Sequence, residues 1–164
     1  MAEHQSIRSI GVIGTPGCGK TTLCKSLDLP VINLQDYAKS HGCLGEIESD
    51  GSAPVDVEKL AELWRQPSTL TLVDSHLAHY LPVDALIVLR CPPAELKKRL
   101  ELRNYSAQKV QQNVEVEMLG GPWNELVDDP RPIFEGSKGV HEWINSGCPA
   151  NTTPDTATDW LSRP

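Results

Sequence analysis

Residues 14–21 constrain this chain most strongly, because they match the phosphate-binding pattern G-x-x-x-x-G-K-[ST]. An apolar run precedes the pattern over about residues 7–13, and a helix-forming stretch follows it over about residues 19–27. Glycines let the backbone wrap a phosphate chain with its N–H groups inward, and the following helix directs its positive end toward the same anion. The pattern therefore predicts a nucleotide site between a strand and a helix, rather than a glycine-rich turn with an exposed lysine.

Two side chains of this loop have predicted roles in phosphate chemistry. We expect Lys20 to reach the β- and γ-phosphates and the Thr21 hydroxyl to bind Mg²⁺. Cys18 lies near the start of the following helix, where its thiol could acquire a lowered pKa. We favour the simpler interpretation, in which Cys18 is a small residue that fills a tight loop.

A second chemical element follows the apolar run at residues 70–74, which ends in Asp74. In folds with a phosphate loop, a carboxylate at the end of a neighbouring strand holds Mg²⁺ directly or through water, and Asp74 fits that role. His76 is expected on the same loop, placed to orient a water or hydroxyl near the γ-phosphate. The alternative for Asp74 is a surface aspartate that starts a turn. The alternative for His76 is a histidine that is structural or merely exposed, which is also the prediction for His79.

Length and composition place the chain among single-domain proteins of the cell interior. Its 164 residues suit one domain, and no basic segment followed by an apolar stretch begins the sequence. No run of about 18 apolar residues occurs, so no membrane contact is expected. The five cysteines are scattered and form no C-x-x-C pair, which favours reduced thiols. We expect a cytoplasmic protein, with a nuclear location open for a eukaryotic source.

Charge is distributed unevenly along the chain. The net charge of −7 argues against extensive contact with nucleic acid. Between Arg90 and Lys109, however, basic residues outnumber acidic ones. Lys97 and Lys98 are best read as a solvated helix face. Arg99 and Arg103 are better candidates for clamping phosphates, because the planar guanidinium suits phosphate oxygens and the spacing of four puts both on one helix face.

Alternating strand and helix signals predict an α/β fold with three layers around a central parallel sheet. The five expected strands cover about residues 7–13, 31–33, 70–74, 85–89 and 140–144. Helices are expected after the phosphate loop, from the Asp56 cap to near Pro67, from Pro92-Pro93 to about residue 102, and after the Ser106 cap. Residues 123–137 are predicted to be mostly irregular. Thr153 and Pro154 predict a terminal helix that carries Trp160 and Leu161.

Several segments together resemble the adenylate kinase isoenzyme 6 family. They are the phosphate loop 14–22, the segment 33–36, the triplet Asp74-Ser75-His76, and the stretch from Leu89 to Asn113 with its Arg99-x-x-x-Arg103-x-Tyr105 spacing. The resemblance covers about residues 7–118. It implies a P-loop kinase fold with one domain over residues 1–164, an acceptor-binding insertion at about 34–55 and a short lid at about 103–113. It also implies a nucleoside-monophosphate kinase with ATPase activity that serves in maturation of the small ribosomal subunit.

Residue by residue, the resemblance implies ATP and a nucleoside monophosphate as substrates, Mg²⁺ as cofactor and a small-subunit ribosomal protein as a possible partner. The implied catalytic residues are Lys20, Asp74, His76 and Arg103, and the implied metal ligands are Thr21 and Asp74. ATP would contact Gly14, Pro16, Gly17, Cys18, Gly19, Lys20, Thr21, Thr22, Arg99 and Arg103. The acceptor would contact Asn33, Asp36 and Lys39.

Two residues depart from the family pattern. Lys39 stands where the family has arginine, which replaces a bidentate grip on the acceptor phosphate by a point charge. Asn104 stands where the lid has glycine, and asparagine tolerates a left-handed backbone better than other side chains do. Two further functions remain open: an assembly ATPase that acts on a ribosomal-protein partner, and a kinase of a small metabolite.

Overall fold

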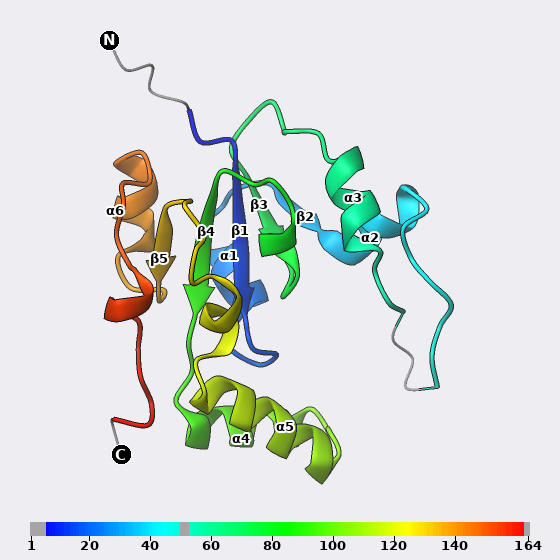
Figure 1. Cartoon of the computed structure of the whole chain (residues 1–164), viewed down its shortest axis with the longest axis vertical. Helices are drawn as coiled ribbons and strands as arrows, with labels where there is room; N and C mark the ends of the chain where they lie inside the picture. The colour runs from blue at the N-terminus through cyan, green and yellow to red at the C-terminus, as the bar shows by residue number, and fades with distance from the viewer. Residues whose placement is uncertain (1–5, 50–52, 163–164) are drawn as a thin grey trace.

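A parallel sheet with strand order β2-β3-β1-β4-β5 forms the middle of the protein (Figure 1). The computed structural model describes residues 6–49 and 53–162. Its strands are β1 (Ser9–Gly14), β2 (Val31–Asn33), β3 (Thr71–Asp74), β4 (Ala85–Leu89) and β5 (Ile133–Glu135). Since β1 pairs in parallel with both β3 and β4, it occupies the centre of the sheet.

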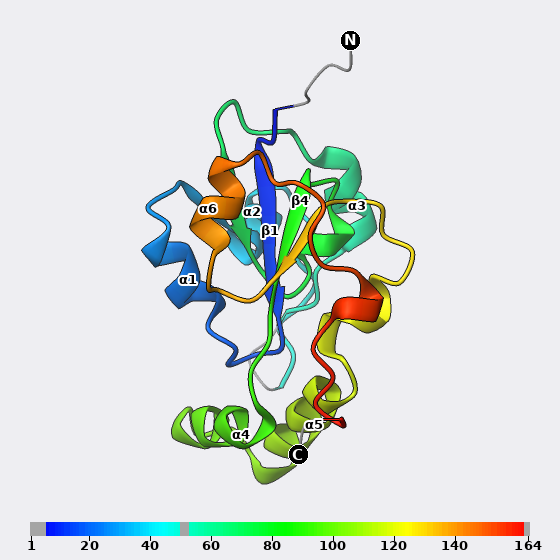
Figure 2. The ribbon, with the colours of Figure 1, turned by 90° about the vertical axis from the view of Figure 1, so that its left-hand side faces the viewer.

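Helices cover both faces of the sheet, which confirms the predicted three-layer α/β fold (Figure 2). The helices are α1 (Lys20–Ser26), α2 (Leu34–Ser40), α3 (Val57–Leu63), α4 (Pro93–Leu102), α5 (Ala107–Met118) and α6 (Val140–Asn145). Three short 3₁₀ turns are η1 (Ala78–Tyr80), η2 (Gly121–Glu125) and η3 (Pro154–Thr156). Helices α4 and α5 lie beyond the carboxyl ends of the strands (Figure 1). None of the helices described is long and apolar enough to cross a membrane.

Each face of the sheet has its own apolar core, because successive side chains of a strand point to opposite faces. In β4, Ala85, Ile87 and Leu89 pack on the side of α1 and α6, whereas Leu86 and Val88 pack on the side of α2 and α3. All five side chains are buried. A strand buried on both faces reads as a continuous apolar run, which is why β4 was predictable from the sequence.

Side-chain caps fix the start of three helices. Asp56 Oδ1 accepts a hydrogen bond from the backbone N–H of Lys59 at the start of α3, and Ser106 Oγ accepts one from Lys109 N at the start of α5. Both caps confirm the sequence prediction. Asn33, expected in the acceptor site, also caps α2 through its Oδ1, which accepts a hydrogen bond from Asp36 N.

The predicted strand at residues 140–144 is wrong, since these residues belong to helix α6. Val140 and Trp143 are its buried side chains, and their spacing of three is helical rather than alternating. The fifth strand is instead β5, within the segment predicted to be irregular. Pro132 directly precedes β5 and obscured it, although a strand at the edge of a sheet tolerates a proline at its start.

The predicted terminal helix is also wrong. Thr153 does form a capping box with Thr156, but only the turn η3 follows it. Beyond η3 the backbone is held by other parts of the chain: Thr158 N donates to Glu135, and Thr158 O accepts from Arg90 Nη1 at 2.7 Å. These tertiary contacts use backbone groups that a helix would need, so the segment with Trp160 is irregular.

Candidate functional site

The phosphate loop turns sharply between β1 and α1 on two glycines. Gly17 and Gly19 have φ values of 92° and 97°, in the region that favours glycine. A Cβ atom on Gly17 would lie 3.0 Å from Leu96 Cδ1 and 3.1 Å from Leu100 Cδ2. Helix α4 therefore packs directly against the loop, and Gly17 satisfies both the backbone conformation and the close approach.

Lys20 begins α1 and faces back along the loop, where its Nζ donates a hydrogen bond to Gly14 O at 3.0 Å. Partial burial lowers the pKa of Lys20 below its usual range, and the positive charge of Arg103 lowers it further. Asp74 and Cys18 oppose this shift. The ammonium group is thus a desolvated cation at the loop, as binding of an anion there requires.

Thr21 and Asp74 meet beside the loop through oxygen atoms that suit Mg²⁺. Thr21 Oγ1 donates a hydrogen bond to Asp74 Oδ2 at 2.9 Å. Asp74 ends β3 and pairs in register with Val12 of β1, which brings its carboxylate to the loop. Mg²⁺ prefers hard oxygen ligands and is often held by one or two carboxylates together with phosphates and water. The pair fits this cation, which would neutralise phosphate charge in the loop.

A first cleft of about 680 Å³ opens beside the loop and α4. It gathers predicted ATP-binding residues from three elements: Gly17, Cys18, Gly19, Thr22, Arg99 and Arg103. Arg99 Nη1 donates to Gly17 O at 3.1 Å, so this guanidinium contacts the loop backbone directly. We refer to this space as the donor cleft.

A second cleft of about 470 Å³ lies between the start of α1 and the end of β3, and we refer to it as the acceptor cleft. Lys20, Asn33, Asp74 and His76 line it, together with Glu48 and other residues of the segments around it. Desolvation lowers the pKa of His76, and the charges of Lys20 and His79 lower it further. A neutral imidazole is therefore favoured next to the loop lysine.

Other predicted residues have different positions. Asp36 and Lys39 are exposed on α2, and neither is among the described residues that line the acceptor cleft.

Gly14 is buried at the end of β1. Asn104 adopts φ 60°, which agrees with the expected left-handed turn between α4 and α5. Burial raises the pKa of Cys18 to about 12, which favours the interpretation as a small residue filling the loop.

Sequence reasoning missed Glu117, a buried carboxylate at the end of α5 that contacts the loop from behind. Its Oε1 accepts a hydrogen bond from Thr15 Oγ1 at 2.8 Å. One feature of the sequence could have revealed it: Glu117 follows Val110 by seven residues, or two helical turns. This spacing puts both residues on the buried face of α5. A glutamate at such a position is ordinarily read as solvent-exposed.

Comparison with known proteins settles the family. The family described as an AAA domain matches residues 10–120. A "Putative adenylate kinase" of Pyrococcus abyssi is 36% identical over 132 residues, covering 77% of this chain and 72% of the relative. The protein of the same name from Methanosarcina acetivorans is 39% identical over 164 residues, covering 92% of this chain and 80% of the relative. The chain belongs to this kinase family.

Solved structures show the same fold at low sequence identity. A shikimate kinase from Acinetobacter baumannii in complex with shikimate gives a TM-score of 0.53 at 14% identity, covering 85% of this chain and 92% of that chain. A sugar kinase from Janibacter gives a TM-score of 0.52 at 16% identity, covering 93% and 99%. Phosphate-loop kinases with unlike acceptors therefore share this architecture.

The packing of α4 on the loop predicts that Gly17→Ala lowers the free energy of unfolding by about 2–3 kcal/mol, from backbone strain and from crowding against Leu96 and Leu100. Gly136→Ala is the matched control, since Gly136 has φ 104° and a Cβ atom there would meet nothing within 4 Å. It should cost about 1 kcal/mol, from strain alone. Urea denaturation of both variants measures the difference, and equal losses would contradict the packing argument.

The lowered pKa of Lys20 predicts a cost to stability that depends on pH. A protonated Lys20 is disfavoured in the folded state, so Lys20→Met should raise the free energy of unfolding at neutral pH. The unfolded state binds more protons between the folded pKa and about 10.4, so the wild type gains stability as pH rises through that window. The advantage of the variant should therefore shrink toward alkaline pH.

Thermal unfolding at neutral and alkaline pH tests this expectation. Lys25→Met is the control, because it removes an exposed lysine from the same helix. An advantage of Lys20→Met that stays constant across the pH range would show that the stabilisation comes from added apolar surface instead.

Proposed function

We propose that the protein catalyses Mg²⁺-dependent transfer of the γ-phosphate of ATP to AMP or a related nucleoside monophosphate, with ATP hydrolysis as a competing outcome. The observation that carries this proposal is that two clefts border the phosphate loop: Gly17 and Gly19 line the donor cleft, and Lys20 lines the acceptor cleft. The donor cleft is lined by residues of the phosphate loop and by three arginines, Arg90, Arg99 and Arg103. The lining of the acceptor cleft includes Asp74 and His76. The names of the archaeal relatives support an adenylate kinase reaction.

Catalysis in this proposal is positioning and charge stabilisation, without a side-chain nucleophile. Lys20 contacts the β- and γ-phosphates, and Thr21 and Asp74 hold Mg²⁺. Arg99 packs beside the adenine, and Arg103 clamps the transferring phosphate. Support for the last role comes from the position of Arg103 in the donor cleft and from its effect on the pKa of Lys20, which requires the two cations to be near one another.

The acceptor binds between Asn33 and His76 in this proposal, and the segments 34–55 and 103–113 act as acceptor-binding insertion and lid. Residues 50–52 of the insertion lie outside the described residues. Asp36 and Lys39 are exposed on α2, whose first residues Leu34 and Gln35 line the acceptor cleft, and their contacts with the acceptor stay predictions. Membership of the adenylate kinase isoenzyme 6 group is supported by the motif resemblance alone.

A specific observation favours ATP hydrolysis as the second candidate function. Among the described residues lining the acceptor cleft, Lys20 is the only lysine or arginine, and Glu48 and Asp74 lie in the same lining. An acceptor phosphate would find little positive charge there, whereas water or an uncharged hydroxyl acceptor needs none. Hydrolysis coupled to a ribosomal-protein partner in maturation of the small subunit is the form that the resemblance suggests.

A coupled assay distinguishes these functions by measuring ADP formation and phosphate release from ATP. With AMP present, we expect ADP formation to exceed phosphate release, and Asp74→Asn to suppress both by about a hundredfold or more because both need the metal. Each nucleoside monophosphate and shikimate, as a hydroxyl acceptor, are tested in parallel. Phosphate release that no acceptor reduces would favour the hydrolase, and full activity of Asp74→Asn would exclude the proposed metal site.

The position of His76 in the acceptor cleft predicts a selective effect. If His76 orients the attacking water, His76→Ala should lower hydrolysis more than transfer to AMP, since a bound acceptor already supplies an oriented nucleophile. Phosphate release and ADP formation are measured on the same variant. His79→Ala is not a suitable control because that ring is buried, so His41→Ala, which changes an exposed histidine beyond α2, is used instead. Equal loss of both activities would leave His76 as a support of the loop.

A further inference from the structure

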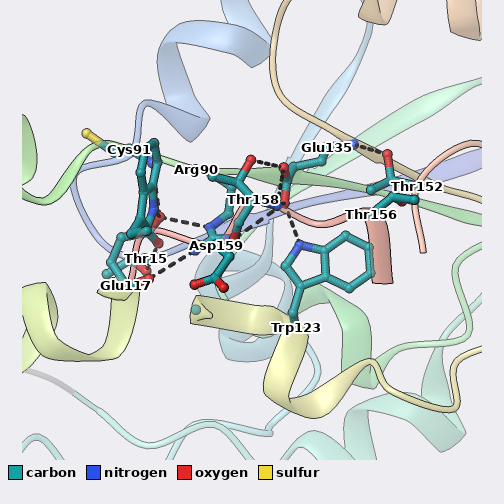
Figure 3. A network of polar contacts seen from close by, with 12 residues as sticks. Thr15, Arg90, Cys91, Glu117, Trp123, Glu135, Thr152, Thr156, Thr158 and Asp159 are labelled. Atoms are coloured by element: carbon teal, nitrogen blue, oxygen red, sulfur yellow. Dashed lines mark hydrogen bonds and ion pairs between the residues drawn. The ribbon is translucent and has the colours of Figure 1, made fainter. Parts of the chain in front are cut away.

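Glu117 is a buried carboxylate that joins segments far apart in the sequence. Its side chain is fully buried and accepts hydrogen bonds from Thr15 Oγ1, Arg90 Nε, the Cys91 backbone N and Trp160 Nε1 at 2.8–3.1 Å. Figure 3 shows Glu117 beside Thr15 and the residues Arg90 and Cys91, which follow β4. A buried charge is tolerated only when it is paired and hydrogen-bonded, and here both conditions are met.

The two carboxylate oxygens serve different segments. Oε1 faces the phosphate loop, where it accepts from Thr15 at 2.8 Å and lies 4.0 Å from Cys18 Sγ. Oε2 accepts the bonds from Arg90, Cys91 and Trp160. The space around Oε1 is tight: a Cβ atom on Gly121 would lie 3.0 Å from it, and Gly121 has φ 56°. The carboxylate is therefore a bridge with one fixed position.

The anchoring side of this bridge extends to the C-terminal segment, residues 157–162. The Arg90 side chain is 4% exposed and also contacts Glu135 Oε2 at 3.4 Å and Thr158 O at 2.7 Å. Thr158 in turn donates its backbone N–H and its hydroxyl to Glu135 (Figure 3). The loop is thus connected through Glu117 and Arg90 to a network that includes Glu135 of β5 and the C-terminal segment.

We propose that Glu117 is a positioning residue for phosphoryl transfer: it holds the phosphate loop in its binding geometry through Thr15 and anchors it to the C-terminal segment through Trp160. This inference rests on the proposed ATP site. Glu117 itself lines neither cleft. It acts through Thr15 of the loop, and through Arg90 and Cys91, which line the donor cleft. A preorganised cradle of N–H groups binds phosphate without the cost of reordering the loop.

Glu117→Gln tests this role, because it keeps the size of the side chain but removes the charge and places an NH₂ group among donors. We expect KM for ATP and Kd for ADP to rise about tenfold, with a smaller change in kcat, since the loop contacts the phosphates in both ground and transition states. A purely structural role would lower the folded fraction, which reduces the apparent kcat and leaves KM unchanged. Glu115→Gln, an exposed residue of the same helix, is the matched control.

Two further variants decide the matter even if Glu117→Gln does not fold. Thr15→Val removes the hydroxyl that meets Oε1, and Trp160→Phe removes the indole N–H that meets Oε2. Each should raise Kd for ADP severalfold, and Thr15→Val combined with Glu117→Gln should be no worse than the weaker-binding single variant. ADP affinity at the wild-type level in Thr15→Val and Trp160→Phe would overturn the inference. Failure of the wild type to bind ADP would instead reject the proposed function.

Discussion

The parallel pairing of β1 with β3 and β4 is the constraint on which the candidate site depends. Because the three strands run in the same direction, their carboxyl ends lie at one edge of the sheet. Val12 pairs with Asp74, and Gly14 pairs with Leu89. The phosphate loop, the carboxylate after β3 and the basic segment after β4 consequently begin side by side. Each role proposed in phosphate chemistry follows from this placement.

Charges on the two sides of the loop are arranged differently. On the cleft side, burial and the charge of Arg103 make the Lys20 ammonium costly, and a bound phosphate would relieve that cost. On the rear side, Glu117 and Arg90 are paired and buried, so the glutamate is compensated by a partner of its own. The acidic group that supports the loop therefore does not cancel the positive potential that a phosphate would meet.

The predictable parts of the structure were those with local signals. Glycine spacing, the apolar run of β4 and the caps Asp56 and Ser106 each specify an element within a few residues, and the structure has these elements. The strand β5 and helix α6 were misassigned, because three-residue edge strands carry little pattern and Pro132 suggested a loop. In the candidate site, the loop and Asp74 were recognisable by motif. Glu117 was not, since its burial depends on partners that only the folded chain brings together.

The bond between Thr15 and Glu117 spans 102 positions of the chain, and the bond from Trp160 adds 43 more. Closing such long segments costs conformational entropy before the contact can form, so interactions of this kind tend to appear late in folding. The turn at Gly17 and Gly19 is local and can form early. We therefore expect newly made chains to pass through a stage in which the sheet and the loop exist while the support behind the loop is still missing, and in which the affinity for nucleotide is low.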